Sequence, residues 1–303
     1  MPVASRSPCQ AGTGRHSSPN RRLISRLLSR QSGVAELLIH PTSQKLIASY
    51  LSRPAHALLL SGPAGIGLST IAHHIATQID AHTYTHDLVP DDKHTITIET
   101  VRSLYKLTSS QRETALVVII DDAEAMGREA QNALLKLLEE PVKHVYFILT
   151  THIPQQLLAT VTSRTQHITL TPLARGTTDQ LFASQDDATR AQIRFLADGL
   201  PAEVTRLAGD ETYLMKQTKL TRDARNFLEG DTYARLLLAK EYGTDREQAE
   251  ALLASLTMLL SFMLFERYAT DHITLLEHIE QIRMRLQQNA HVRTQLTYLV
   301  TRF

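Results

Sequence analysis

This chain has little cysteine, a net charge near zero and no long apolar run, and each of these features excludes a class of protein or site. The single cysteine, Cys9, cannot form a disulfide framework or a thiolate zinc site, and the 14 histidines show no ligand spacing. We therefore expect no metal, no zinc and a reducing, cytoplasmic setting. The formal net charge of +1 argues against an extended footprint on nucleic acid. The most apolar stretch, residues 251–265, is shorter than the roughly 20 residues that span a bilayer, which predicts a buried bundle helix and no membrane contact.

Residues 1–32 are rich in arginine and serine, and the first 35 residues contain no acidic side chain. So few apolar residues cannot form a core, which predicts a disordered basic tail. Two other interpretations stay open: an organelle transit peptide, and a dispensable tail or an initiation site placed too far upstream. The arginines that interrupt its apolar stretch exclude a secretory signal.

A strand–helix–strand pattern dominates the middle of the chain. Leu116–Ile120 and Val145–Leu149 are short runs rich in β-branched residues, and the residues between them recur at helical spacing until Pro141. Polar residues follow each run, Asp121-Asp122 after the first and Thr150-Thr151 after the second. This pattern predicts a buried parallel sheet with a ligand-binding edge.

The other elements are predicted from the same rules. Residues 36–51 and 99–108 have helical patterns, with Pro41 breaking the start of the first and Thr42 or Ser43 capping it. Residues 80–97 are polar and give only a short strand at 96–98. After Pro172 the pattern is helical throughout, with segments at 191–196 and 199–207 and then at 210–228, 231–242, 247–269 and 275–298.

A glycine-rich loop connects the predicted strand Ala57–Leu60 to a helix that carries Ile71 and Ile75 on one face. Its spacing is that of a phosphate-binding loop, with Leu68 where that loop has lysine. Backbone N–H groups could still bind an anion, and a hydroxyl could still reach magnesium, but the charge that phosphoryl transfer needs is missing. The alternative is that a strand-to-helix junction simply needs small residues. The candidate nucleotide-binding residues of this degenerate loop are Gly62, Gly65, Gly67, Leu68 and Ser69.

Asp121 and Asp122 complete the candidate nucleotide site. An aspartate at the end of this strand can hold magnesium through water, and a following carboxylate can polarise an attacking water. The second interpretation is an acidic cluster at a helix start, since Asp122 and Glu124 precede an apolar helix.

Three segments resemble the AAA+ subunits of the bacterial clamp loader of DNA polymerase III. They are Asn132–Pro141 (NALLKLLEEP), Phe147–Thr151 (FILTT) and Leu157–Thr165 (LLATVTSRT). The resemblance covers about residues 35–210 well and the remainder only by helical character. It implies an α/β plus all-α fold, in which a P-loop AAA+ parallel sheet carries a helical lid and a C-terminal helical collar. The implied domains after the 1–32 tail are 33–172 (AAA+), 173–209 (lid) and 210–303 (collar and oligomerisation).

Within that family, Leu68 resembles the delta prime type of subunit, whose loop is often degraded, more than the ATP-hydrolysing gamma/tau type. Two features depart from the family pattern: residues 80–97 carry no four-cysteine zinc module, and Thr165 replaces the cysteine of the motif Ser-Arg-Cys. The resemblance therefore implies no intrinsic ATPase activity and no firm cofactor, with ATP and magnesium left as a weak candidate.

The resemblance gives Arg164, with its neighbour Ser163, a catalytic role in trans. Arginine suits a finger on a neighbour's γ-phosphate because its permanent planar charge can meet two oxygens at once. From spacing alone, Arg164 would instead be a surface ion-pair partner. Thr151, or Thr150 beside it, lies where the family has a γ-phosphate sensor.

The implied function is that of a non-catalytic clamp-loader subunit that helps to load the sliding clamp on primed DNA. The implied partners are gamma/tau and delta subunits, the sliding clamp and, through the complex, primer–template DNA. Two alternatives stay open: a gamma/tau-type ATPase subunit, and a stand-alone AAA+ protein that binds nucleotide or DNA.

Overall fold

The computed structural model describes residues 37–79, 83–91, 94–108, 114–266 and 270–303. The predicted basic tail, with Cys9, lies outside these residues. Residues Ile39–Phe303 form one compact unit.

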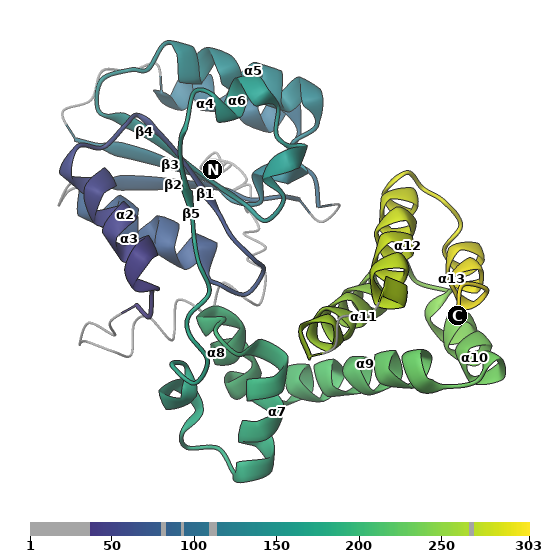
Figure 1. Ribbon diagram of the computed structural model, residues 1–303. Coiled ribbons are helices and arrows are strands. Elements are labelled where there is room, and N and C mark those ends of the chain that lie inside the picture. Colours follow the sequence, from purple (N-terminus) through teal and green to yellow (C-terminus); the bar gives the residue numbers. More distant parts are fainter. Residues whose placement is uncertain (1–36, 80–82, 92–93, 109–113, 267–269) are drawn as a thin grey trace, which may run out of the picture. The chain divides into compact units, whose positions relative to one another are not determined.

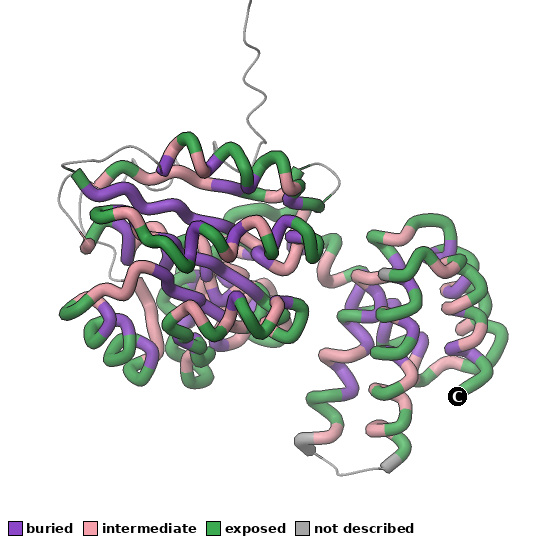
Figure 2. The backbone as a smooth tube through the Cα atoms, turned by 90° about the horizontal axis from the view of Figure 1, so that it is seen from above, coloured by how far each residue is buried: buried purple, intermediate pink, exposed green. Residues whose placement is uncertain are grey.

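Its centre is a parallel sheet of five strands in the order β2-β3-β4-β1-β5 (Figure 1). Of the three inner strands, β1 and β3 are buried at every position and β4 at every position except Tyr146, because helices cover both faces of a parallel sheet (Figure 2). This sheet and the helical remainder confirm the predicted fold class. The strands are β1 (Ala57–Ser61), β2 (Tyr84–Leu88), β3 (Leu116–Ile120), β4 (Val145–Thr151) and β5 (Gln166–Thr169).

The two edge strands, β2 and β5, were not predicted. Both are short and polar, so neither contains an apolar run that signals a strand. In β5 the polar residues have partners in the sheet, since the Ser61 hydroxyl lies 2.7 Å from His167 Nε2 and donates to Thr169 Oγ1 at 3.2 Å. The strand predicted at 96–98 is wrong: Ile96 makes an isolated bridge with Met126, and Ile98 already begins a helix.

Helices cover the two faces of the sheet separately (Figure 1). On one face, α2 (Pro41–Ser52) and α3 (Leu68–Ile79) pack on Leu58 and Leu60; on the other, α4 (Ile98–Thr108) and α5 (Arg128–Glu139) pack on Leu59. The alternation of these three leucines follows from the two-residue period of a strand.

The predicted start of the first helix is wrong. Pro41 does not break it but is its first residue, a position where the missing N–H is not needed. The N-cap is His40, whose Nδ1 accepts a hydrogen bond from the Thr42 N–H at 3.2 Å. Ser43, a predicted cap, is instead buried and accepts from the Thr171 N–H at 3.0 Å.

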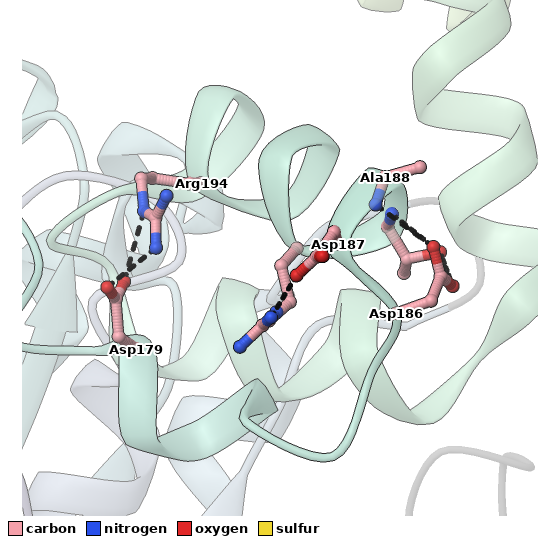
Figure 3. Close-up of polar contacts among 7 residues, drawn as sticks. Asp179, Asp186, Asp187, Ala188 and Arg194 are labelled. Atoms are coloured by element: carbon pink, nitrogen blue, oxygen red, sulfur yellow. Dashed lines mark hydrogen bonds and ion pairs between the residues drawn. The ribbon is translucent and has the colours of Figure 1, made fainter.

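A small helical group follows β5. The 3₁₀ turn η3 (Asp179–Phe182), α7 (Asp187–Ala197) and α8 (Pro201–Gly209) share a core around Phe182 and Ile193. Figure 3 shows how two carboxylates fix α7: Asp186 caps it by accepting from the Ala188 N–H, and Asp179 binds Arg194 at 2.7 Å. Helix α8 begins at Pro201, two residues after the start of the segment predicted at 199–207.

The C-terminal residues form five helices around one apolar core, in the part of the chain that the structure describes. The single helix predicted at 275–298 is wrong, because two helices occupy it. The chain turns at Asn289, whose φ of 64° is a left-handed conformation that asparagine tolerates. The helices are α9 (Glu211–Glu229), α10 (Thr232–Tyr242), α11 (Arg246–Glu266), α12 (Thr270–Gln287) and α13 (Val292–Val300).

Helix α11 is more apolar along its length than predicted. Over Arg246–Leu264, 19 residues, it is long and apolar enough to cross a membrane, by length and composition alone. Leu252, Leu253 and Leu256 on this helix are fully buried in the bundle core, which gives its apolar character a structural reason.

Asp223 is a buried carboxylate in this bundle, and the Tyr242 hydroxyl donates to it at 2.7 Å. Burial and the contact with Asp223 raise the pKa of Tyr242, so the hydroxyl remains a donor. Tyr242→Phe should therefore lower the free energy of unfolding by about 1–3 kcal/mol, since the buried carboxylate loses its hydrogen-bond donor and keeps only the longer ion pairs with Lys219 and Arg222. Tyr233→Phe, on the exposed side of the same helix, is the control and should change it by less than about 0.5 kcal/mol. Urea denaturation of both variants measures the difference; equal values would show that this hydrogen bond adds nothing.

Candidate functional site

The glycine-rich loop has the backbone of a phosphate-binding loop. It leaves β1 with the Gly62 N–H donating to the Thr151 carbonyl at 3.4 Å, and it enters α3 with the Ile71 N–H donating to Gly67 at 3.0 Å. Gly65 and Gly67 have φ angles of 82° and 95°, which side chains rarely adopt. The strand, loop and helix predicted from the sequence are therefore present.

Leu68, at the position of the missing lysine, is part of the core. Only 3% of its surface is exposed, and it packs in the cluster that contains Leu58 and Ile71. Ser69 beside it is half-buried. The loop thus presents no positive side chain at Leu68, and the residue found there stabilises α3 against the sheet.

Helix α8 lies against this loop. The Glu203 N–H donates to the Gly65 carbonyl at 3.0 Å, and a Cβ added at Gly65 would lie 2.6 Å from the Cβ of Glu203. A Cβ added at Gly67 would lie 3.3 Å from Ala202. The close approach of α8 therefore requires a glycine at position 65, and at position 67 it adds a tight contact to the constraint of the positive φ angle.

The carboxyl ends of β3 and β4 bring the predicted acids and hydroxyls together. Asp121 accepts a hydrogen bond from the Thr150 hydroxyl at 2.5 Å, and the Asp122 N–H donates to the same hydroxyl at 3.1 Å. Thr150, rather than Thr151, contacts the acidic pair. The Thr151 hydroxyl instead accepts from the Ile153 N–H at 3.1 Å.

His152 joins this edge to the loop and was missed by the sequence analysis. The ring Nδ1 of His152 lies 2.9 Å from the Gly62 carbonyl, and its ring Nε2 lies 3.8 Å from the Asp122 carboxylate. The backbone N–H of His152 donates to the Glu124 carboxylate at 2.8 Å. No local sequence signal marks it, because its role depends on the parallel pairing of β1 with β4.

Asp122 has a left-handed backbone and a carboxyl with a raised pKa. Its φ of 49° is left-handed, and burial raises the pKa of its carboxyl, as do the neighbouring charges of Asp121 and Glu124. Among the described residues no group of three or more His, Cys, Asp or Glu side chains could hold a metal ion. Leu68 is buried, so the loop offers no lysine at that position, and Asp121 already accepts a hydrogen bond from the Thr150 hydroxyl.

Arg164 lies at the other end of the α/β region, just after α6 (Ala159–Thr162). Its guanidinium donates to the Thr160 carbonyl at 3.0 Å and forms an ion pair with Glu139 of α5 at 2.8 Å, with 37% of its side chain exposed. Ser163 donates to the Thr160 carbonyl at 3.2 Å and thus helps to end the helix. The arginine is held by its own chain and stays accessible to another molecule.

Gln131 connects the segment after β3 to the segment before α6 and was also missed. It is buried on α5, and its amide group donates to the carbonyls of Met126 and Gln156 and accepts from the Leu158 N–H at 2.7 Å. The segment after β3 and the helix before Arg164 therefore share one buried side chain.

Comparison with known proteins gives consistent matches. The family described as "DNA polymerase III, delta subunit" matches residues 80–174. The DNA polymerase III subunit delta' of Escherichia coli K12 is 28% identical over 85% of this chain and 88% of that protein. DNA polymerase III subunit tau of the same organism is 33% identical over 38% of this chain and 21% of that protein. A solved DNA polymerase III gamma subunit-related protein from Thermotoga maritima has a TM-score of 0.55 at 17% identity, covering 86% of this chain and 97% of that chain, and so shares the fold.

Replacing Gln131 tests the buried connection. Gln131→Leu should lower the free energy of unfolding by about 2–4 kcal/mol, because buried backbone groups lose their partners. Hydrogen exchange at the Leu158 amide should accelerate, whereas the exposed Gln155→Leu should change neither quantity. Unchanged exchange at Leu158 in Gln131→Leu would contradict this account.

Replacing Asp122 tests the charge repulsion at the acidic edge. Because folding raises the pKa of the Asp122 carboxyl, the protonated carboxyl stabilises the folded state at pH values below its ordinary pKa of 3.8. This stabilisation is lost as the pH rises through the folded-state pKa. At neutral pH, Asp122→Asn should therefore stabilise the protein, by less than about 1 kcal/mol because the group is half-exposed and screened. Asparagine also tolerates the left-handed backbone.

Thermal unfolding at pH 7 and at pH 3.5 measures this effect. The advantage of Asp122→Asn should shrink at the lower pH, where aspartate is itself protonated. Destabilisation at pH 7 would show that the ionised carboxylate makes a favourable contact instead.

Proposed function

We propose that this chain, which is similar to a DNA polymerase III subunit delta' over 85% of its length, is a non-catalytic, delta prime type subunit of the bacterial DNA polymerase III clamp loader of AAA+ proteins. In the assembled loader it takes part in placing the sliding clamp on primed DNA. It holds a position in the ring and supplies Arg164 to the ATP site of a neighbouring subunit. The observation that carries the proposal is the burial of Leu68 at the lysine position.

The delta prime assignment rests on two observations. The loop lacks the charge that an ATP-hydrolysing gamma/tau subunit needs, and Leu68 has become part of the hydrophobic core. The similarity to a delta' subunit extends over 85% of this chain, against 38% for a tau subunit. A stand-alone AAA+ protein remains the alternative if no clamp-loader subunit binds this chain.

The surroundings of Arg164 suit a finger that acts in trans. The guanidinium is half-exposed, and an exposed ion pair such as that with Glu139 contributes about 1 kcal/mol or less. A neighbour's phosphate can therefore replace Glu139 with little penalty, and it gains a bidentate, permanently charged partner. Ser163 contributes by ending α6 so that Arg164 leaves the helix at this point.

The separate hydrophobic cores support a division of the chain into three domains after the tail. We assign residues 33–172 to the AAA+ domain, 173–209 to the lid and 210–303 to the collar, each described part having a core of its own. The partners are gamma/tau and delta subunits and the sliding clamp, with primer–template DNA contacted through the assembled complex. The expected location is the cytoplasm, where replication takes place in bacteria.

Arg164→Ala should leave the fold intact and reduce ATP hydrolysis by a loader reconstituted with gamma-type and delta subunits. The site that receives the arginine should lose activity by a factor of about 10³ or more, and Arg164→Lys should restore little of it. Arg190→Ala, which removes another exposed arginine from an ion pair, is the matched control. Clamp loading and DNA-dependent ATPase rates provide the measurement.

Three outcomes would overturn parts of this proposal. Full ATPase activity with Arg164→Ala would remove the role of the arginine. Tight binding of an ATP analogue by the isolated chain would favour a gamma/tau-type subunit. Failure to co-purify with gamma-type and delta subunits would favour a stand-alone protein.

A further inference from the structure

The first turn of α8 is seated on the glycine-rich loop. Glu203 makes the closest approach, through the backbone hydrogen bond to Gly65 and through its Cβ, which lies 2.6 Å from where a Cβ on Gly65 would be. Ala202 approaches Gly67 in the same way, at 3.3 Å. The contact at Gly65 leaves no room for a Cβ there, whereas a Cβ at Gly67 would make a tight contact with Ala202.

The carboxylate of Glu203 is fixed above the loop by neighbouring side chains. Its Oε1 accepts from the Tyr213 hydroxyl at 2.8 Å, and its Oε2 lies 3.6 Å from the position that a Cβ on Gly65 would take. Arg206 stacks over the Tyr213 ring at 3.7 Å from its centroid. Burial and Glu203 raise the pKa of Tyr213 to about 12, so the phenol keeps its proton and remains a donor.

Charge at this position decides which ligand the loop can accept. A helix N-terminus carries partial positive charge, and the first turn of α8 would otherwise add to the attraction that the loop's N–H groups exert on an anion. Glu203 is the acidic residue in the first turn of α8, so it neutralises that attraction. A phosphate entering the loop would meet a fixed carboxylate and would have to displace α8.

We propose that Glu203 is a specificity-determining residue that excludes nucleotide phosphates from the loop, independently of Leu68. Helix α8 then packs on Gly65 and Gly67, and this packing explains why the loop has glycines although it lacks its lysine. The proposal rests on the proposed function, in which this chain does not use nucleotide. It adds that restoring the lysine would be insufficient.

Binding of a fluorescent ATP analogue with magnesium to the full chain tests the proposal. Leu68→Lys alone should bind weakly, and Leu68→Lys combined with Glu203→Gln should bind about tenfold more tightly, because a like charge near the phosphates is removed. Glu211→Gln, which neutralises an exposed acid at the start of α9, is the matched control and should have no such effect.

The outcomes separate this inference from the proposed function. Equal affinity of the single variant and the double variant would overturn the role of Glu203 and leave the proposed function standing. Tight binding by the unaltered chain would overturn the proposed function itself.

The contact between α8 and the glycine-rich loop can also be tested without nucleotide. This second test is needed because a lysine at the buried position 68 could disturb folding. Gly65→Ala must displace α8, since the added methyl would meet the Cβ of Glu203 and alanine disfavours the φ of 82°. Hydrogen exchange at the Glu203 amide should then accelerate at least about tenfold, as its bond to Gly65 is lost. Gly209→Ala, on the same helix with nothing within 4 Å of the added Cβ, should leave it unchanged. Unchanged exchange in Gly65→Ala would overturn the inference.

Discussion

Burial of the parallel sheet is the constraint on which the rest of the structure depends. Helices cover both faces, so β3 carries only apolar side chains and β1 does so up to Ser61, and the polar residues at and after the strand ends gather at the carboxyl edge. The loop, the acidic pair and Thr150 lie together there because the strands are parallel and in register. The same burial explains why Leu68 matters: it contributes apolar surface to the core at a position that a nucleotide-hydrolysing loop reserves for a charge.

The edge of the sheet is held by contacts within the chain. Asp121 is bound by the Thr150 hydroxyl, His152 connects the loop to Asp122, and α8 is seated on the glycines. Asp121 and the carbonyls of Gly62 and Gly65 therefore each have a partner from the protein. Arg164, in contrast, stays partly exposed beside its ion pair with Glu139.

Local sequence patterns predicted the apolar strands and helices correctly. They did not predict the features that depend on contacts between residues far apart in the sequence. The strands β1, β3 and β4 and the helix before Pro141 follow from runs and periodicity. The polar strand β5 was missed because its hydrogen-bonding partners, such as Ser61, are distant in sequence. The break at Asn289 was missed because a single left-handed residue hardly changes a helical pattern. His152 and Gln131 were missed because their partners are backbone groups on other elements.

The sequence by itself determined the α/β sheet, the helical remainder, the absence of a loop lysine and the motif that contains Arg164. These follow from the order and type of neighbouring residues, which the chain carries whether folded or not. Only the tertiary structure decided what Leu68 does instead of a lysine, which threonine meets the acidic pair, and that Glu203 lies against Gly65. Those facts depend on distances between residues far apart in the chain, and such distances exist only once the sheet, the loop and helix α8 have packed together.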